Sequence, residues 1–365
     1  MSLDPVTGGG TVERIRQLHA AMRDIEGVSS RILSVAVGEV ETGLKDTVLL
    51  SCWSRRWYLP APKLVTMCRM VRQADVIHLM NHWTFINAII YWLARLTRTP
   101  YIICPAGALP LFGRSQGFKR WYNRLVGAAL VRNCTAAIAI AEDEALVLQE
   151  YGVTQERIFH IPNGVREQDF SFSDAGLFRQ QLAIGGVEYL LFVGRLNQIK
   201  GPDLLLQAFV SIADHFPHLH LVFAGPDGGM LDSLAQAAAK AGLADRIHFV
   251  GYTGGELKSS AYHGASLLVV PSRQEAMSIV ALEGAICGVP VVLTDCCGFD
   301  QLHDAGAARL TAASEQSLAE EICVLMSDAE LRQKMGLAGR HFAQEHYTWD
   351  IAVDRYIEIC REMVA

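Results

Sequence analysis

Short apolar runs alternate with helical stretches along almost the whole chain, and this alternation constrains the fold more than any other feature. The runs are rich in Val, Ile and Leu and are bounded by turn residues, as strands buried on both faces of a parallel sheet are. The pattern predicts strands at 31–37, 46–51, 75–80, 100–106, 136–141 and 157–163 in the first half, and at 189–194, 220–225, 246–251, 267–272 and 290–295 in the second. The expected class is α/β with doubly wound parallel sheets.

Length and local composition predict two such domains. With 365 residues, of which 51% are apolar and 19% charged, the chain is long enough for two hydrophobic cores. A polar segment with glycines at both ends, "NGVREQDFSFSDAGLFRQQLAIGG", separates the two series of strands. We expect one domain over 1–170 and a second over 171–346, with the default ligand site in a cleft between them.

Composition also limits the compartment and the partners. No apolar run reaches the ~18 to 20 residues of a membrane span, and "MSLDPVTGGG" lacks the pattern of a secretory signal. Nine cysteines without a C-x-x-C pair favour a reduced, cytoplasmic location. Residues 1–165 carry 18 Lys and Arg against 13 Asp and Glu, whereas the remainder carries 14 against 25. Unlike charge on two halves suits a small anionic ligand held between them.

Two glutamates stand eight positions apart in the apolar stretch "EAMSIVALE", which begins at Glu275. A helix starting near Ser278 would place Glu283 on its buried face, and Glu275 would lie just ahead of the helix start, where free N–H groups from Ala276 onward favour an anion. The glutamates could accept hydrogen bonds from sugar hydroxyls. Alternatively, Glu283 meets a buried Arg or backbone donors, and Glu275 only favours the helix dipole. The residues alone leave both interpretations open.

Two further segments suggest a phosphate site. In "LLFVGRLNQIKG" a strand ends at Gly194 and is followed by Arg195 and Lys200, two cations that could neutralise phosphates. In "PVTGGGTVERI" three glycines, including Gly9 and Gly10, are expected to precede a helix and to let the backbone approach a ligand. This glycine segment matches neither the dinucleotide nor the P-loop pattern.

Taken together, "GRLNQIKG", the E-x7-E of "EAMSIVALE", the N-terminal glycines, "IPNGV" and a late "YTW" resemble the family-4 retaining glycosyltransferases over nearly the whole chain. The resemblance implies the GT-B fold of two facing Rossmann-like domains, with the segment after about residue 347 returning to the first domain. It also implies sugar transfer from a nucleotide-diphosphate donor, with retention and without a metal. The absence of an Asp-x-Asp pair from the sequence agrees with this.

The resemblance also assigns roles to residues. Arg195 and Lys200 would hold the diphosphate, Glu275 would touch the sugar, Glu283 would accept from the ribose hydroxyls, and residues near Tyr252 would flank the base. Backbone groups would surround the diphosphate at Gly194, Ala276, Met277 and Ser278, with Gly9 and Gly10 of the first domain closing over it. No cofactor is expected beyond the donor itself, for which a UDP-sugar is favoured over a GDP-sugar.

Three positions depart from the family pattern. An apolar strand usually precedes the glycines, where this chain has "MSLDP". Ala106 stands where many relatives have a donor-contacting His or Arg, and Arg166 stands where an acid is common. His82 could instead supply a cleft imidazole for catalysis, although a lone loop histidine is more often structural.

The acceptor is not encoded in a recognisable motif. "GFKRWYNRLVGAALVR" interleaves Lys119, Arg120 and Arg124 with aromatic residues, and "SRRWYLP" adds Arg55 and Arg56. This could favour peripheral contact with an anionic membrane surface and a lipid-linked acceptor, or it could be a solvated basic face. The expected role is therefore in polysaccharide or glycolipid synthesis, without nucleic acid. A dehydrogenase is disfavoured by the missing glycine fingerprint, and a non-catalytic nucleotide-sugar binder stays as the alternative.

Overall fold

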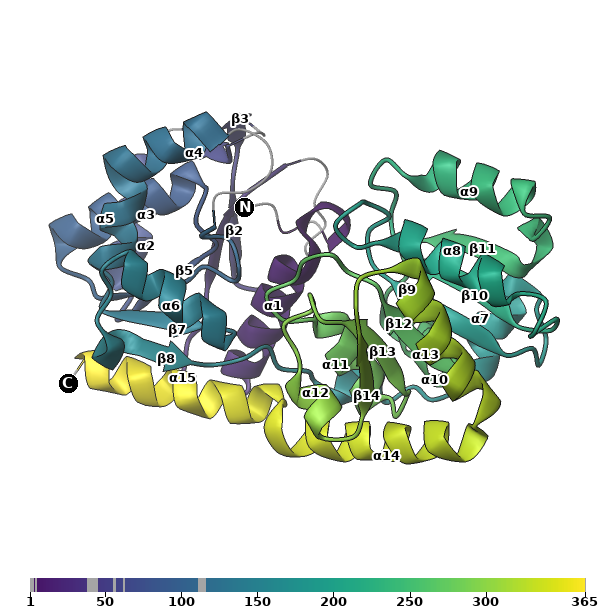
Figure 1. Cartoon of the computed structure of the whole chain (residues 1–365). Coiled ribbons are helices and arrows are strands. Elements are labelled where there is room, and N and C mark those ends of the chain that lie inside the picture. The colour runs from purple at the N-terminus through teal and green to yellow at the C-terminus, as the bar shows by residue number, and fades with distance from the viewer. Residues whose placement is uncertain are drawn as a thin grey trace. The chain divides into compact units, whose positions relative to one another are not determined.

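The computed structural model describes residues 3, 5–37, 45–54, 57–61, 63–110 and 116–364, with the backbone alone for 5–9. The chain forms two compact units, shown in Figure 1. Unit 1 comprises Met1–Asn163 and Trp349–Ala365, and unit 2 comprises Gly164–Thr348. The sequence had suggested divisions after residues 170 and 346. We describe each unit by itself.

Unit 1 contains parallel strands in two sheets, one of two strands in the order β1-β2 and one of four in the order β5-β6-β7-β8. A short antiparallel pair, β3-β4, accompanies them. The strands are β1 (Ile32–Val35), β2 (Thr47–Leu50), β3 (Cys52–Ser54), β4 (Leu59–Pro60), β5 (Ile77–Met80), β6 (Tyr101–Cys104), β7 (Ala136–Ala139) and β8 (Ile158–His160).

The helices of unit 1 pack against these strands around one apolar core, which includes Val35, Leu79 and Ile103. Its helical segments are α1 (Pro5–Arg23), α2 (Leu64–Gln73), α3 (Phe85–Thr97), α4 (Gln116–Tyr122), the π-helical η1 (Asn123–Gly127), α5 (Ala128–Arg132), α6 (Glu142–Glu150), η2 (Gln155–Arg157) and α15 (Trp349–Val364). The last of these, drawn in yellow in Figure 1, belongs to unit 1 although it follows unit 2 in the chain.

Unit 2 is built on one parallel sheet of six strands in the order β11-β10-β9-β12-β13-β14. The strands are β9 (Tyr189–Val193), β10 (His220–Ala224), β11 (Ile247–Gly251), β12 (Leu267–Val270), β13 (Val291–Thr294) and β14 (Ala308–Thr311). β12 and β13 are buried throughout, as expected for central strands covered on both faces. The order reverses at β9, because the chain next forms β10 on one side and β12 later on the other.

The helical segments of unit 2 are η3 (Glu167–Phe170), α7 (Ala175–Leu182), α8 (Pro202–Ile212), α9 (Leu231–Lys240), η4 (Ala244–Arg246), α10 (Gly255–Gly264), α11 (Ile279–Ile286), α12 (Gln301–Asp304), α13 (Glu315–Ser327) and α14 (Ala329–His346). The two ends of the unit meet, since the N–H of Val165 donates to the carbonyl of Tyr347 over 2.8 Å and Val165 forms a β-bridge with Thr348. Unit 2 is therefore a continuous segment whose first and last residues are neighbours.

All eleven predicted strands are present, and the expected α/β class with parallel sheets is confirmed. Three strands were not predicted. β3 and β4 have only three and two residues. β14 is an edge strand that carries Arg309, whose guanidinium bonds to Glu321 over 2.6 Å. A polar residue inside so short a run hides the strand pattern.

Candidate functional site

Most of the predicted residues of unit 2 lie in the loops that follow β9 and β12, beside the end of β13. These strands are neighbours in the sheet and parallel, so the loops that follow them leave the same edge. Ligands of such sheets bind beyond the carboxyl ends of the strands, next to the point where the strand order reverses. The three loops, 194–201, 271–278 and 295–300, define the candidate site.

The loops after β9 and β12 bring together the predicted cation Lys200 and the predicted anion Glu275. Lys200 Nζ lies 2.8 Å from Glu275 Oε1, and the two side chains are 30% and 9% exposed. The hydroxyl of Ser272, itself 1% exposed, donates to the same oxygen. The sequence placed both charges near a ligand, and the structure shows them bonded to each other.

A second ion pair, which the sequence analysis missed, joins the loop after β12 to the loop after β9 and to the start of α8. The guanidinium of Arg273 donates to both oxygens of Asp203 over 2.8 and 2.7 Å, and its backbone N–H donates to the carbonyl of Ile199 over 2.7 Å. Burial is the largest single effect and raises the pKa of Asp203, but the hydrogen bond and the positive charge of Arg273, together with backbone N–H donors, outweigh it, so the pKa lies below its ordinary value. In the sequence, the only sign of this ion pair is an arginine two positions before Glu275.

Glycines allow the strand ends and loops to pack closely. Gly201 has a φ of +66°, and a Cβ built on it would lie 2.0 Å from the carbonyl oxygen of Pro271. A Cβ on Gly225 would lie 1.9 Å from the carbonyl oxygen of Gly194. No larger residue fits either position without moving the backbone.

Glu283 is buried, as its position on α11 predicts, and its partners lie inside unit 2. It is 1% exposed, and its two oxygens accept from Lys258 Nζ over 2.6 Å and from the Tyr262 hydroxyl over 2.7 Å. Glu283 therefore has donors inside unit 2, as the second interpretation requires, but they are a lysine and a tyrosine and not an arginine or backbone groups. A contact with ribose would have to share this carboxylate.

The start of α11 differs from the expectation in one respect. Ser278 is the N-cap, and its hydroxyl accepts from the N–H of Ala281. Its own N–H already donates to the carbonyl of Cys297 over 3.1 Å, so the prediction that this N–H caps a diphosphate is wrong for the structure as it stands. Ala276 and Met277 lie in the loop before the helix, and Met277 is buried.

The other predicted residues of unit 2 lie on nearby strand ends. Arg195 follows Gly194 and is half-buried, with its Cγ 2.9 Å from a Cβ built on Gly228. Tyr252 directly follows β11 and is 51% exposed. Its ring is therefore free to contact a planar ligand.

In unit 1, two expectations are corrected. Gly9 and Gly10 lie within α1, which begins at Pro5, rather than in a loop that precedes a helix. His82 is fully buried, so it is not a cleft imidazole. Its Nε2 bonds to the Asn123 side chain over 2.8 Å, and burial lowers its pKa to about 4 although this hydrogen bond acts in the opposite direction. Arg55 and Arg56 lie outside the described residues.

A buried arginine of unit 1 was not anticipated. Arg14 of α1 is 1% exposed and donates to Ile161, Pro162 and Asn163, and to the hydroxyl of Tyr356 in α15 over 2.8 Å. Its partners are 147 to 342 positions away in the chain. Local sequence patterns carry no signal of such contacts.

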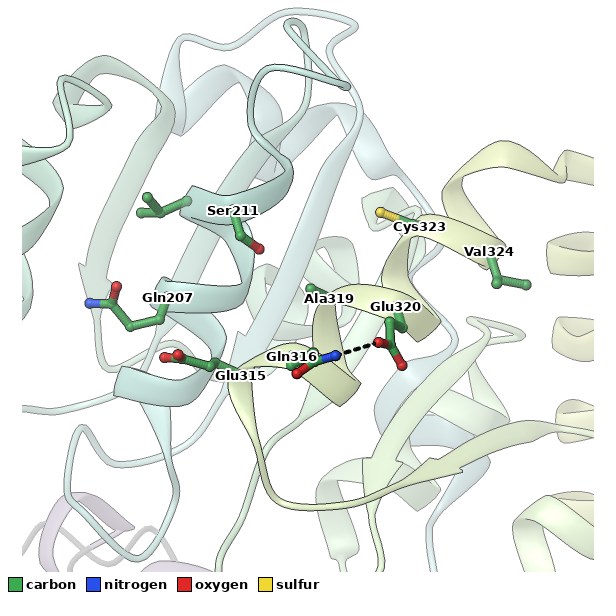
Figure 2. A pocket seen from close by; sticks show the side chains of 9 residues that line it. Gln207, Ser211, Glu315, Gln316, Ala319, Glu320, Cys323 and Val324 are labelled. Atoms are coloured by element: carbon green, nitrogen blue, oxygen red, sulfur yellow. Dashed lines mark hydrogen bonds between the residues drawn. The ribbon is translucent and has the colours of Figure 1, made fainter.

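One surface hollow, of about 670 Å³, lies between α8 and α13 (Figure 2). Figure 2 shows Gln316 bonded to Glu320 on its floor. It contains none of the predicted site residues; its lining is Gln207, Val210, Ser211, Glu315, Gln316, Ala319, Glu320, Cys323 and Val324. We therefore place the candidate site at the strand ends and not in this hollow.

Neither a metal-binding cluster nor a membrane-spanning helix is found among the described residues. No group of three or more His, Cys, Asp or Glu there is arranged to hold a metal ion. Within the same residues, no helix has both the length and the hydropathy needed to cross a bilayer.

Comparison with known families identifies both units. Residues 9–164 match the model of the glycosyl transferase 4-like domain, and residues 175–342 match that of the glycosyl transferases group 1. A D-inositol 3-phosphate glycosyltransferase of Saccharomonospora viridis is 30% identical over 310 residues, which are 80% of this chain and 70% of that protein. The enzyme of that name from Geodermatophilus obscurus is 33% identical over 236 residues, 60% of this chain and 51% of that protein. The chain thus spans about half the length of several curated relatives that it matches.

Solved structures agree on the fold. HepE of Anabaena, in complex with UDP and glucose, superposes with a TM-score of 0.80 at 20% identity and covers 98% of this chain and 96% of its own. WaaG, a glycosyltransferase involved in lipopolysaccharide biosynthesis, gives 0.70 at 19% identity, with 96% of each chain covered. The fold is that of the GT-B glycosyltransferases, with two Rossmann-like domains.

Proposed function

Because this chain belongs to the glycosyl transferases of group 1, we propose that it transfers a sugar from a nucleotide-diphosphate donor to a glycan or lipid-linked acceptor. The observation that carries the proposal is the ion pair of Lys200 with Glu275 at the carboxyl ends of β9 and β12. A phosphate-binding cation and a hydroxyl-binding carboxylate side by side suit a donor in which a sugar is joined to a diphosphate.

Most of the predicted residues of unit 2 have a role in this proposal. Lys200 and Arg195 neutralise the diphosphate and stabilise it as it leaves, which is the electrostatic part of catalysis. Glu275 accepts from hydroxyls of the transferred sugar, Glu283 from the ribose, and Tyr252 flanks the base. Backbone groups near the diphosphate are those of Gly194, Ala276 and Met277, whereas Gly9 and Gly10 stay a prediction from the resemblance.

The reaction is proposed to retain the configuration at the anomeric carbon. The bond from that carbon to the diphosphate oxygen breaks, and a bond to the acceptor oxygen forms on the same face. The acceptor proton passes to the leaving phosphate, so Glu275 is not a covalent nucleophile. Two cations at the diphosphate supply the charge neutralisation that a divalent metal would supply, and we propose that the enzyme needs neither a metal nor a cofactor.

The proposed donor is a UDP-sugar rather than a GDP-sugar. HepE, which shares the fold, has been solved with UDP-glucose and with UDP. The UDP bound by this protein of the same fold supports uracil as the base of the proposed donor. The proposed setting is polysaccharide or glycolipid synthesis in the cytoplasm.

Turnover tests the proposal. The protein is incubated with UDP-, GDP- and ADP-sugars and candidate acceptors, and release of the nucleoside diphosphate is followed. We expect release from a UDP-sugar that is unaffected by EDTA. Binding of the donor without release under any condition would instead favour the alternative, a non-catalytic nucleotide-sugar binder or partner subunit.

The α3–α4 surface of unit 1 supports a membrane-associated acceptor. Trp121 and Leu125, one turn apart, are 50% and 57% exposed, and Trp92 and Leu96 of α3 are 55% and 79% exposed. Phe118 of α4 packs on Phe85 of α3 with ring centroids 6.1 Å apart, so the two helices are neighbours. Exposed arginines stand next to these apolar side chains at positions 95, 98, 120 and 124.

We propose that this surface rests on an anionic bilayer from the cytoplasmic side. Aromatic side chains favour the interface, and each basic residue near an anionic surface contributes about 1 kcal/mol. Sedimentation with vesicles, with and without anionic lipid, at physiological salt tests it. Binding should need the anionic lipid and should weaken in the double variant Trp121→Ala/Leu125→Ala. Failure to sediment with anionic vesicles would rule the contact out.

A further inference from the structure

The turn that follows β13, Thr294–Gly298, holds the loop that carries Glu275. The N–H of Glu275 donates to the carbonyl of Cys296 over 2.8 Å, and the N–H of Ser278 donates to that of Cys297 over 3.1 Å. Both ends of the loop are thus bonded to consecutive carbonyls of one turn. The backbone of the loop is fixed before any ligand arrives.

Gly298 makes this close approach possible. Its φ is +60°, and a Cβ built on it would lie 2.1 Å from the carbonyl oxygen of Ala276. A side chain at this position would push the loop away from the turn, because the atom that it meets is backbone and not a flexible side chain.

Two buried hydroxyls connect the turn after β13 with the carboxylate of Glu275. Thr294, which is fully buried, donates its hydroxyl to the carbonyl of Ser272, and Ser272 donates its own hydroxyl to Glu275 Oε1. Lys200 Nζ bonds to that oxygen as well. Within the described residues, both donors use Oε1, which leaves Oε2 to face a ligand.

We propose that Ser272 and Thr294 are positioning residues, which hold the Glu275 carboxylate so that Oε2 accepts from a hydroxyl of the donor sugar. The inference rests on the proposed function and deepens it. Neither residue touches the donor; each acts through Glu275. The physical basis is preorganisation: a carboxylate already held by a buried neighbour needs no rearrangement when the transition state forms.

Kinetics with UDP-glucose test the proposal, with UDP release as the readout. Ser272→Ala should lower kcat about 10-fold and leave the KM for UDP-glucose within about 2-fold, since one charge-assisted hydrogen bond is lost in the transition state. Ser272→Thr, which keeps the hydroxyl, should restore most of the activity. Thr294→Val should behave like Ser272→Ala, and Thr294→Ser should behave like the wild type.

A double variant separates positioning from a structural effect. If Ser272 acts through Glu275, adding Ser272→Ala to Glu275→Gln should change kcat by less than about 2-fold, because residues that act as a unit are not additive. Ser211→Ala is the control: like that of Thr294, the Ser211 hydroxyl donates to a backbone carbonyl, over 2.8 Å, but on α8. It should leave kcat unchanged.

Three results would overturn the inference. A full 10-fold loss in the Glu275→Gln background would show that Ser272 acts independently of the carboxylate. A loss of melting temperature that accounts for the loss of kcat would show a merely structural role. Wild-type kcat in Ser272→Ala, together with a strong defect in Glu275→Gln, would remove the positioning role and leave the proposed function intact. A wild type that neither binds any UDP-, GDP- or ADP-sugar of the panel nor releases a nucleoside diphosphate from it would overturn both.

Discussion

Lys200 and Glu275 contribute to activity and stability to different extents. Replacing either by Ala should lower transfer by at least about 100-fold, as removal of a transition-state contact does. The melting temperature should change little, because a partly exposed ion pair contributes about 1 kcal/mol or less. Lys240→Ala, which removes an exposed lysine at the end of α9, should leave UDP release unchanged. A large melting loss in Lys200→Ala would mean that the pair is structural.

Replacing Glu283, in contrast, should strongly lower the stability of the protein. Glu283→Ala leaves Lys258 and Tyr262 without their acceptor in a buried site, which costs about 3 to 5 kcal/mol. Tyr262→Phe removes only one donor and should cost about 1 kcal/mol. Thermal unfolding of the two variants measures the difference. Equal stability of Glu283→Ala and the wild type would show that Glu283 only binds the ligand.

His82 should make unit 1 sensitive to mild acid. Its pKa in the folded protein is about 4, below the ordinary 6.5, so between these values the unfolded chain binds a proton that the native state does not. The contribution of His82 to stability is then full above pH 6.5 and falls by ~1.4 kcal/mol per pH unit until about pH 4. Urea unfolding at pH 7, 6 and 5 measures this slope. It should be smaller in His82→Gln, and an unchanged slope would show that His82 is not its source.

The residues that sequence alone misassigned share one physical cause. His82 stands in a loop after a strand, and nothing local indicates that α4 and η1 cover it. Ser278 occupies the predicted helix start, but the carbonyl that takes its N–H comes from Cys297, 19 positions later. Lys200 and Glu275 could be predicted because each follows a recognisable strand, and adjacent parallel strands bring their loops together.

Among the elements, the attachment of α1 to the rest of unit 1 depends on one buried side chain. Arg14 donates to the segment 161–163 after β8 and to Tyr356 of α15, so it joins α1 to both. Arg14→Ala should destabilise the protein by at least about 3 kcal/mol, because several buried acceptors lose their donor together. Arg14→Lys should recover little, since an ammonium lacks the planar fork. Calorimetry against the exposed variant Arg361→Ala tests this, and equal stability of the two would contradict it.

The elements that the sequence predicted are those whose pattern is local. Fully buried strands such as β7 and β12 are continuous apolar runs, and α11 is bounded by Ser278 at its start and Gly288 after its end. The start of α1 was placed too late, because three successive glycines usually weaken a helix. Packing of the rest of α1 against α15 outweighs that local preference.

For the whole molecule, the division into two units makes a direct prediction. Unit 2 has its own core and its first and last residues pair, so the fragment 164–348 should fold alone with a cooperative melting transition. It should also bind UDP in calorimetry, since Lys200, Glu275 and Tyr252 are all within it. A fragment 1–163 lacks α15 and should not fold. A disordered 164–348 fragment would show that the unit needs the rest of the chain.

The return of α15 to unit 1 has a consequence for synthesis on the ribosome. Arg14 emerges early but meets Tyr356 only after more than 340 further residues, including all of unit 2, have been translated. Unit 2 can complete its sheet first, while the Arg14 guanidinium, which already has the acceptors of residues 161–163, still lacks the Tyr356 hydroxyl. The usual order, in which an N-terminal domain folds first, would then be reversed. The first unit to be made would be the last to be finished.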